Sequence, residues 1–110
     1  MQIIEEKFND IYVFKLSGRL DSNTSPEFNE KITQVIEDGF NFMVIDFENT
    51  EYISSAGLRV ILKATKDLKQ AAGKLVLCSM SENVRDIFKI TEFDTFLPIV
   101  TTVDDALNKF

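Results

Sequence analysis

Two short apolar runs constrain the fold of this 110-residue chain more than any other feature of its sequence. Residues 42–47 read Phe-Met-Val-Ile-Asp-Phe, and residues 75–78 read Leu-Val-Leu-Cys. Nearly continuous apolar runs of this length are typical of strands that are buried on both faces, as the strands of a parallel sheet are. Successive parallel strands need a crossover between them, which is usually a helix. The two runs therefore predict an α/β fold with a mostly parallel sheet.

Amphipathic stretches around these runs predict the helices. Residues 21–27 hold dense helix-start signals, because Thr24 and Glu27 have the spacing of a capping box and Pro26 suits a first turn. Gly39 then ends this first helix with a left-handed cap. A second helix is predicted from about residue 57 to 72, with Gly73 as its stop. The apolar stripes of the two helices are Phe28, Ile32, Val35 and Ile36, and Leu58, Ile61, Leu62, Thr65 and Leu68.

The ends of the chain complete the pattern. Residues 11–17 alternate as a strand covered on one face does, with residues 2–7 as the hairpin partner and a turn at residues 9–10. Ser81 and Thr102 are predicted to cap two further helices, and Phe110 is expected on the apolar face of the last one. A final strand is predicted at residues 96–100, where Pro98 favours a sheet edge. The predicted order is β-β-α-β-α-β-α-β-α in a single domain of residues 1–110.

The composition excludes several kinds of chemistry. The chain has no His and one Cys, Cys78. A His-based triad, a Cys/His zinc site and an intrachain disulfide are therefore excluded. The four glycines are isolated, so the chain has no glycine-rich phosphate loop, and its acidic residues lack calcium-loop spacing. We expect no metal and no cofactor.

The charge of the chain is unevenly distributed. Its formal net charge is −6, which disfavours direct binding to nucleic acid or to an anionic membrane. Residues 1–55 hold 4 basic and 11 acidic side chains, whereas residues 56–110 hold 8 and 7. Neither a signal peptide nor an apolar run long enough to span a bilayer is visible, so a cytoplasmic location is expected.

Most of the basic excess lies on the predicted second helix. Arg59, Lys63 and Lys66 stand at i, i+4 and i+7 there. Such a row is usually a solvated helix face. It could equally be a docking face for an acidic partner, because complementary charge steers association.

The loop before that helix is the sharpest local feature. Residues 51–58 join a predicted buried strand to a helix N-terminus, and Ser54 and Ser55 lie in the middle of this loop. One interpretation is that these serines simply cap the helix. The other is that one of them is phosphorylated, because a helix N-terminus offers backbone N–H groups and a partial positive charge to an anion.

Two catalytic interpretations of this region fail on the residues themselves. Ser55-Ala56-Gly57 is half of a nucleophile elbow, but Ile53 stands where the first glycine should be and no His can serve as base. Asp46 could be a phospho-acceptor of the receiver-domain kind, but the acidic pair and the Lys that such domains need are missing. We expect Asp46 to be a strand-end carboxylate that hydrogen-bonds the following loop.

The whole chain resembles the STAS-domain anti-sigma factor antagonists of bacteria. Two segments carry most of the resemblance: Gly18-Arg19-Leu20-Asp21, followed by Thr24 and a helix, and residues 52–62, which read Tyr-Ile-Ser-Ser-Ala-Gly-Leu-Arg-Val-Ile-Leu. In that family, a serine directly before a small residue and Gly-Leu is phosphorylated by a partner kinase. The chain departs from the family at two positions. Ser54 replaces the usual Asp before the acceptor serine, and Arg19 replaces an acidic residue.

The resemblance implies a function as well as a fold. The unmodified antagonist binds an anti-sigma factor that is also a serine kinase, phosphorylation releases it, and a PP2C-type phosphatase resets it. Carried over to this chain, the acceptor is Ser55, and Ser54 is a second candidate acceptor. We expect a non-enzymatic partner switch that regulates sigma-factor-dependent transcription. The residues predicted to form the switch loop and to bind the partner are Asp21, Ser54, Ala56, Gly57, Leu58, Arg59, Lys63 and Lys66. The alternative is a STAS module that senses a nucleotide or small anion.

Overall fold

A five-stranded sheet forms the middle of the computed structural model, which describes residues 1–95 and 97–110. The first two strands pair antiparallel and the remaining pairs are parallel. The strands stand in the sheet in the order in which they occur in the chain: β1 (Gln2–Phe8), β2 (Ile11–Leu20), β3 (Phe42–Ile53), β4 (Lys74–Cys78) and β5 (Ile99–Val100).

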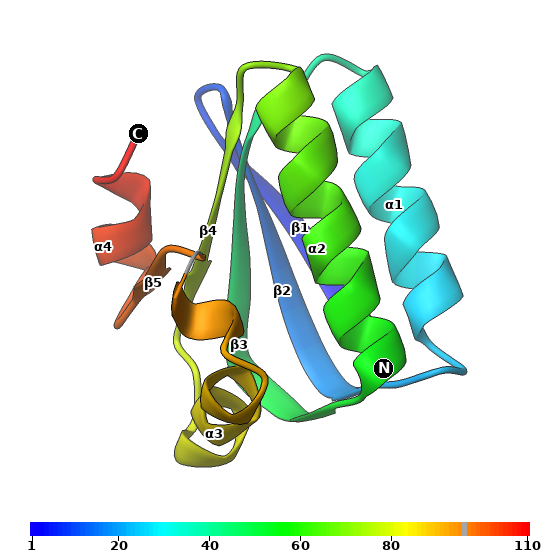
Figure 1. Cartoon of the computed structure of the whole chain (residues 1–110). Coiled ribbons are helices and arrows are strands. Elements are labelled where there is room, and N and C mark those ends of the chain that lie inside the picture. The colour runs from blue at the N-terminus through cyan, green and yellow to red at the C-terminus, as the bar shows by residue number, and fades with distance from the viewer. Residues whose placement is uncertain (96) are drawn as a thin grey trace.

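Helices cover the sheet unequally (Figure 1). α1 (Ser25–Glu37) and α2 (Ser55–Gln70) lie side by side on one face. α4 (Val103–Leu107) lies on the other face, and α3 (Glu82–Ile90) packs at one end of the sheet. The predicted α/β fold, its element order and its mostly parallel sheet are confirmed.

The larger core fills the space between the sheet and the helices α1, α2 and α3. Phe14 of β2 and Phe28 of α1 are fully buried there, with ring centroids 5.4 Å apart. Phe47 of β3 and Phe88 of α3 make a similar contact at 6.0 Å. A smaller cluster, which includes Ala106, lies between the sheet and α4. The apolar stripes that defined the helices in the sequence thus hold α1 and α2 in the same core, on one face of the sheet.

The start of α1 differs from the prediction. Thr24 is the residue before the helix, but its side chain makes no capping hydrogen bond, so the expected capping box is wrong. The Thr24 hydroxyl instead donates to the carbonyl oxygen of Arg19 at 2.8 Å and accepts from the backbone N–H of Asp21 at 2.9 Å. It serves the loop that leaves β2, and is therefore unavailable to the helix.

Several predicted boundaries were also wrong. β3 continues past Phe47 to Ile53, because it pairs with β2 beyond the end of β4. α2 begins at Ser55 rather than at Gly57 and ends at Gln70. α4 ends at Leu107, so Phe110 lies outside it, with its ring 5.7 Å from that of Phe42.

The last strand is shorter than predicted. It comprises Ile99–Val100 alone, and Phe96 lies outside the described residues. Pro98 precedes the strand and accepts a hydrogen bond from the Leu77 N–H through its carbonyl oxygen. The predicted edge position is confirmed, since β5 stands last in the sheet and pairs with β4 alone among the described strands. Across the part of the chain that is described, every helix is too short or too polar to cross a bilayer.

Candidate functional site

The predicted loop of residues 51–58 is wrong in extent, because β3 runs to Ile53 and α2 begins at Ser55, which leaves Ser54 as the connection. We keep the name switch loop for Ser54 and the first turn of α2. It lies where the carboxyl ends of β2 and β3 meet the N-terminal ends of α1 and α2 (Figure 1). A backbone hydrogen bond of 2.9 Å from the Ser54 N–H to the Leu20 carbonyl ties the loop to the end of β2. Carboxyl ends of strands in open α/β sheets are where ligands and modifications gather. The topology therefore brings Asp21 and the serine loop to the same end of the sheet, although they are far apart in the sequence.

The two serines of the loop have different structural roles. Ser54 is the N-cap of α2 and is half-buried, and its Oγ accepts from the Gly57 N–H at 3.4 Å. Ser55 is the first residue of the helix and is exposed. The capping interpretation thus holds for Ser54, while the Ser55 hydroxyl faces solvent at a helix N-terminus.

This difference predicts a difference in stability. Ser54→Ala removes the capping acceptor and should lower the free energy of unfolding by about 1 kcal/mol. Ser55→Ala should change it by less than about 0.5 kcal/mol, because the side chain is exposed. Urea denaturation of the two variants beside the unmodified chain measures both values. Equal losses would mean that Ser55 also caps the helix.

Gly57 and Leu58 hold the loop against the sheet. A Cβ on Gly57 would lie 2.8 Å from both the carbonyl oxygen and Cγ of Leu20 and 3.0 Å from Cγ2 of Ile53. Leu58 is 6% exposed and belongs to the main core. Gly57 therefore lets α2 approach the end of β2 closely, and Leu58 anchors the first turn of α2 in the core. Neither residue presents a side chain on the surface for a partner to contact.

Asp21 organises the loop between β2 and α1. Its Oδ1 accepts from the backbone N–H groups of Asn23 at 2.9 Å and Thr24 at 3.2 Å. These hydrogen bonds, with the Asn23 bond contributing most, hold the pKa of Asp21 below its ordinary value. Arg19 lies 3.8 Å from Asp21 through its Nε and stacks on the Tyr52 ring, 4.5 Å from the centroid. Arg19 of β2 thus contacts both the loop that follows its own strand and the end of β3.

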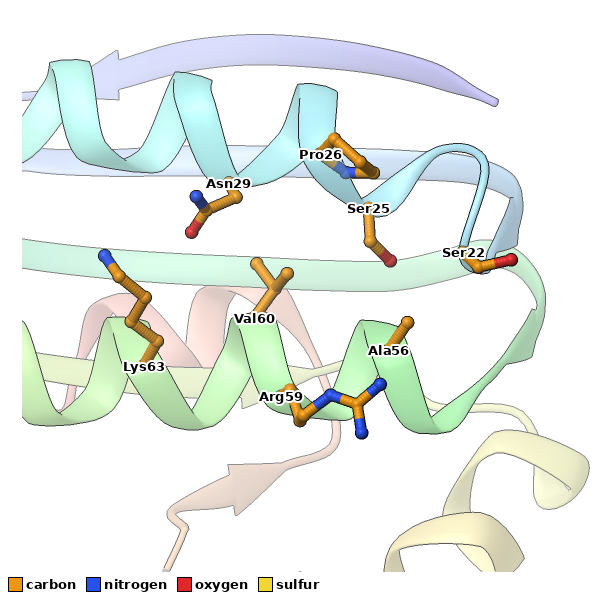
Figure 2. Close-up of a pocket in the computed structure, with 8 residues that line it drawn as sticks. All are labelled: Ser22, Ser25, Pro26, Asn29, Ala56, Arg59, Val60 and Lys63. Atoms are coloured by element: carbon orange, nitrogen blue, oxygen red, sulfur yellow. The ribbon is translucent and has the colours of Figure 1, made fainter.

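The basic residues of α2 are on its surface. Arg59, Lys63 and Lys66 are all exposed. Lys63 forms an ion pair of 2.9 Å with Asp67, whereas Arg59 forms none with the described residues. Arg59 and Lys63, together with Ala56, line a groove between α1 and α2 (Figure 2).

The opposite wall of this groove was not predicted. Ser25 and Asn29 of α1 line it, and the sequence marked them only as part of a helix start and a helix body. Their position depends on how α1 packs beside α2, which no local signal encodes.

The other candidate groups take no part in this site. Asp46 lies within β3 rather than at its end, is 3% exposed, and accepts from the Glu48 N–H at 2.9 Å. Its expected strand-end position is therefore wrong, because β3 is longer than the apolar run. Cys78 is fully buried, and burial raises the pKa of its thiol to about 11, so it is a packed side chain rather than a reactive one.

This fold, with its serine loop at a helix N-terminus, is that of a STAS domain. Residues 2–106 match the STAS domain family, and the chain belongs to it. A protein of Bordetella bronchiseptica described as a candidate anti-sigma factor antagonist, BtrV, is 31% identical over all of this chain and 95% of its own length. The anti-sigma-B factor antagonist of Staphylococcus aureus is 32% identical over 79% of this chain and 78% of its own.

A solved structure gives the same result. The crystal structure of an anti-sigma factor antagonist from Mycobacterium paratuberculosis superimposes with a TM-score of 0.89 and 26% identity. The match covers 98% of this chain and 92% of that one. The family suggested by the two sequence segments is therefore confirmed.

Proposed function

We propose that this chain is an anti-sigma factor antagonist that binds an anti-sigma factor when unmodified and is released when Ser55 is phosphorylated. The observation that carries the proposal is the exposed Ser55 hydroxyl on the first residue of α2. Relatives that align with most or all of the chain carry the name of that class. The chain regulates transcription through this binding, in the cytoplasm, and catalyses no reaction of its own.

Ser55 is a better acceptor than Ser54. A kinase must reach the hydroxyl oxygen, and Ser55 is exposed whereas Ser54 is half-buried. The Ser54 oxygen also accepts the Gly57 N–H, so that phosphorylating it would disturb the cap of α2. Ser54 therefore holds the helix start in place while Ser55 receives the phosphate.

Phosphorylation at this position changes the surface more than the fold. A phosphoserine carries about −1.5 to −2 charge, and the partial positive charge of the α2 N-terminus stabilises it locally. A partner packed over the same loop would have to accommodate the added charge and bulk. The switch thus works by loss of surface complementarity.

The proposed partners follow from the same step. The anti-sigma factor is also the serine kinase that modifies Ser55, so that its binding face and its active site both meet this loop. A PP2C-type phosphatase removes the phosphate and restores the binding form. The exposed position of Ser55 is compatible with access by both enzymes.

The test is to co-express the chain with the anti-sigma factor kinase encoded by the same genome and to measure intact mass. The unmodified sequence and Ser54→Ala should each gain one phosphate, and Ser55→Ala should gain none. Each variant should also be tested for co-purification with the kinase, because Ser55→Ala should stay bound. Full phosphorylation of Ser55→Ala would assign the acceptor to another residue and would overturn this proposal.

A further inference from the structure

The groove between α1 and α2 begins beside the switch loop and has features that the phosphorylation of Ser55 does not use. The groove has a volume of about 400 Å³ and is open to solvent. Its floor is mostly apolar, because Pro26, Ala56 and Val60 line it. Figure 2 shows Ala56 and Val60 pointing from α2 toward α1. An open apolar groove on a surface fits the side chains of a protein segment better than it fits a small molecule, which needs enclosure.

One wall of the groove contains an unpaired buried hydroxyl. Ser25 is 4% exposed, and its Oγ is the one buried side-chain polar atom without a hydrogen-bond partner among the described residues. Figure 2 shows this oxygen pointing from α1 toward α2, on the side of Ala56. A buried hydroxyl without a partner costs free energy, which an incoming acceptor would recover.

The other wall contains a cation that is not neutralised within the described residues. Arg59 is exposed and forms no ion pair there, whereas Lys63, one turn further along α2, is paired with Asp67. The Arg59 guanidinium extends along α2 toward Ala56 (Figure 2). A hydroxyl donor and a guanidinium thus stand on opposite sides of one short stretch of apolar floor.

This combination selects the chemistry of the occupant. A carboxylate accepts from both a hydroxyl and a guanidinium, and its negative charge makes its hydrogen bonds to a guanidinium stronger than those of a neutral amide or hydroxyl oxygen. The apolar floor requires that the carboxylate be carried beside an aliphatic or aromatic side chain. Charge favours the same occupant, since α2 is locally basic on a chain whose net charge is −6.

We propose that the α1–α2 groove binds an acidic–apolar segment of the anti-sigma factor, with its carboxylate between Ser25 and Arg59 and its apolar side chain on Val60. This inference rests on the proposed function and extends the docking surface from the switch loop across to α1. It makes Ser25 and Asn29 partner-binding residues, although they lie on a different helix from the phosphorylated serine.

Filling the groove from the α1 side tests the proposal without changing α2 or the loop. Asn29 is half-buried on the groove wall, and Asn29→Trp should lower affinity for the anti-sigma factor at least tenfold in calorimetry. Glu30→Trp is the matched control, because Glu30 is exposed on α1 and does not line the groove; it should leave affinity within twofold. Circular dichroism verifies that both variants are folded.

Two further variants test the polar walls. Arg59→Glu should lower affinity at least a hundredfold, whereas Lys69→Glu, the same charge change on α2 away from the groove, should lower it less than tenfold. Ser25→Ala should lower affinity several-fold without lowering the melting temperature, because it removes a hydroxyl that is unpaired in the free protein. Loss of affinity without loss of stability is the result that a merely structural role would not produce.

Three results would overturn the inference. Unchanged affinity of Asn29→Trp would place the partner on α2 alone. NMR shifts at the groove on adding ATP or inorganic phosphate at micromolar concentration, without a protein, would make the occupant a small anion. If the unmodified chain binds no anti-sigma factor, the proposed function fails, and the role of the groove fails with it.

Discussion

Phosphorylation of Ser55 should weaken binding of the chain to its anti-sigma factor by more than about a hundredfold, which corresponds to about 3 kcal/mol. The reason is that a dianion at the exposed start of α2 must be desolvated, or must hold the partner away, when the partner packs over the loop. Titration calorimetry on the chain with and without phosphoserine at position 55 measures the difference.

Matched substitutions separate charge at Ser55 from charge near it. Ser55→Asp should bind at least tenfold more weakly than the unmodified chain, and Ser55→Ala should bind with unchanged affinity. Ser54→Asp introduces the same charge one residue earlier, at an N-cap position that favours Asp, and should retain binding.

The thermal stability of the phosphorylated chain is the control that separates a surface effect from unfolding. Phosphorylated and unmodified chains should melt within a few degrees of each other, because the α2 N-terminus favours a negative charge by about 0.3–1 kcal/mol. A phosphorylated chain that binds as tightly as the unmodified one would contradict the surface mechanism. A phosphorylated chain that unfolds would replace it with a refolding mechanism.

The second large effect is expected at Gly57. Gly57→Ala should lower the free energy of unfolding by about 1–3 kcal/mol, because the added Cβ would overlap Leu20 and push α2 away from the end of β2. The sign of this change in unfolding free energy is informative, since replacing glycine with alanine inside a helix ordinarily stabilises a protein by about 1 kcal/mol. Urea denaturation measures the change.

A control and a functional readout accompany this variant. Ser55→Ala, two residues earlier in the same helix, should be nearly neutral, so that a large loss at Gly57 alone reports the contact with Leu20. Gly57→Ala should also weaken partner binding, because displacing α2 moves Ser55 and Arg59 together. Stabilisation by Gly57→Ala would show that α2 can shift freely.

The order of helices and strands was predictable because the apolar runs and helix caps that mark them are local in the sequence and compete with no other contact. The caps at Ser81 and Thr102 form as predicted. The Ser81 hydroxyl oxygen accepts from the backbone N–H of Val84, and the Thr102 hydroxyl oxygen accepts from the backbone N–H of Asp105. Thr24 carried a similar signal but lies within reach of Arg19, and the loop uses its hydroxyl. The polar end of β3 has no apolar run to mark it, because Glu48 and Asn49 are exposed there. Among the described strands this end of β3 pairs with β2 and not with β4.

The site was predictable in part for the same reason. The serine loop and the basic row of α2 are contiguous in the sequence, and helical spacing relates them directly. The division of roles between Ser54 and Ser55 depends on which hydroxyl accepts the Gly57 N–H, and the sequence does not specify this. The groove was not predictable, because Ser25 and Arg59 come to line it only when two helices pack side by side on one sheet.

The strand order has a consequence for how a kinase meets its target. Each strand pairs with the strand before it in the chain, so β3 is the central strand and β1 and β5 are the edges. Amide hydrogens of β3 should therefore exchange last, and those of the edges first. Only Ser54 separates Ser55 from Ile53, the last residue of β3, and the Ser54 N–H is hydrogen-bonded to β2 through the Leu20 carbonyl. A kinase would meet this serine in a preformed geometry rather than as a flexible peptide, and would recognise a shape more than a sequence.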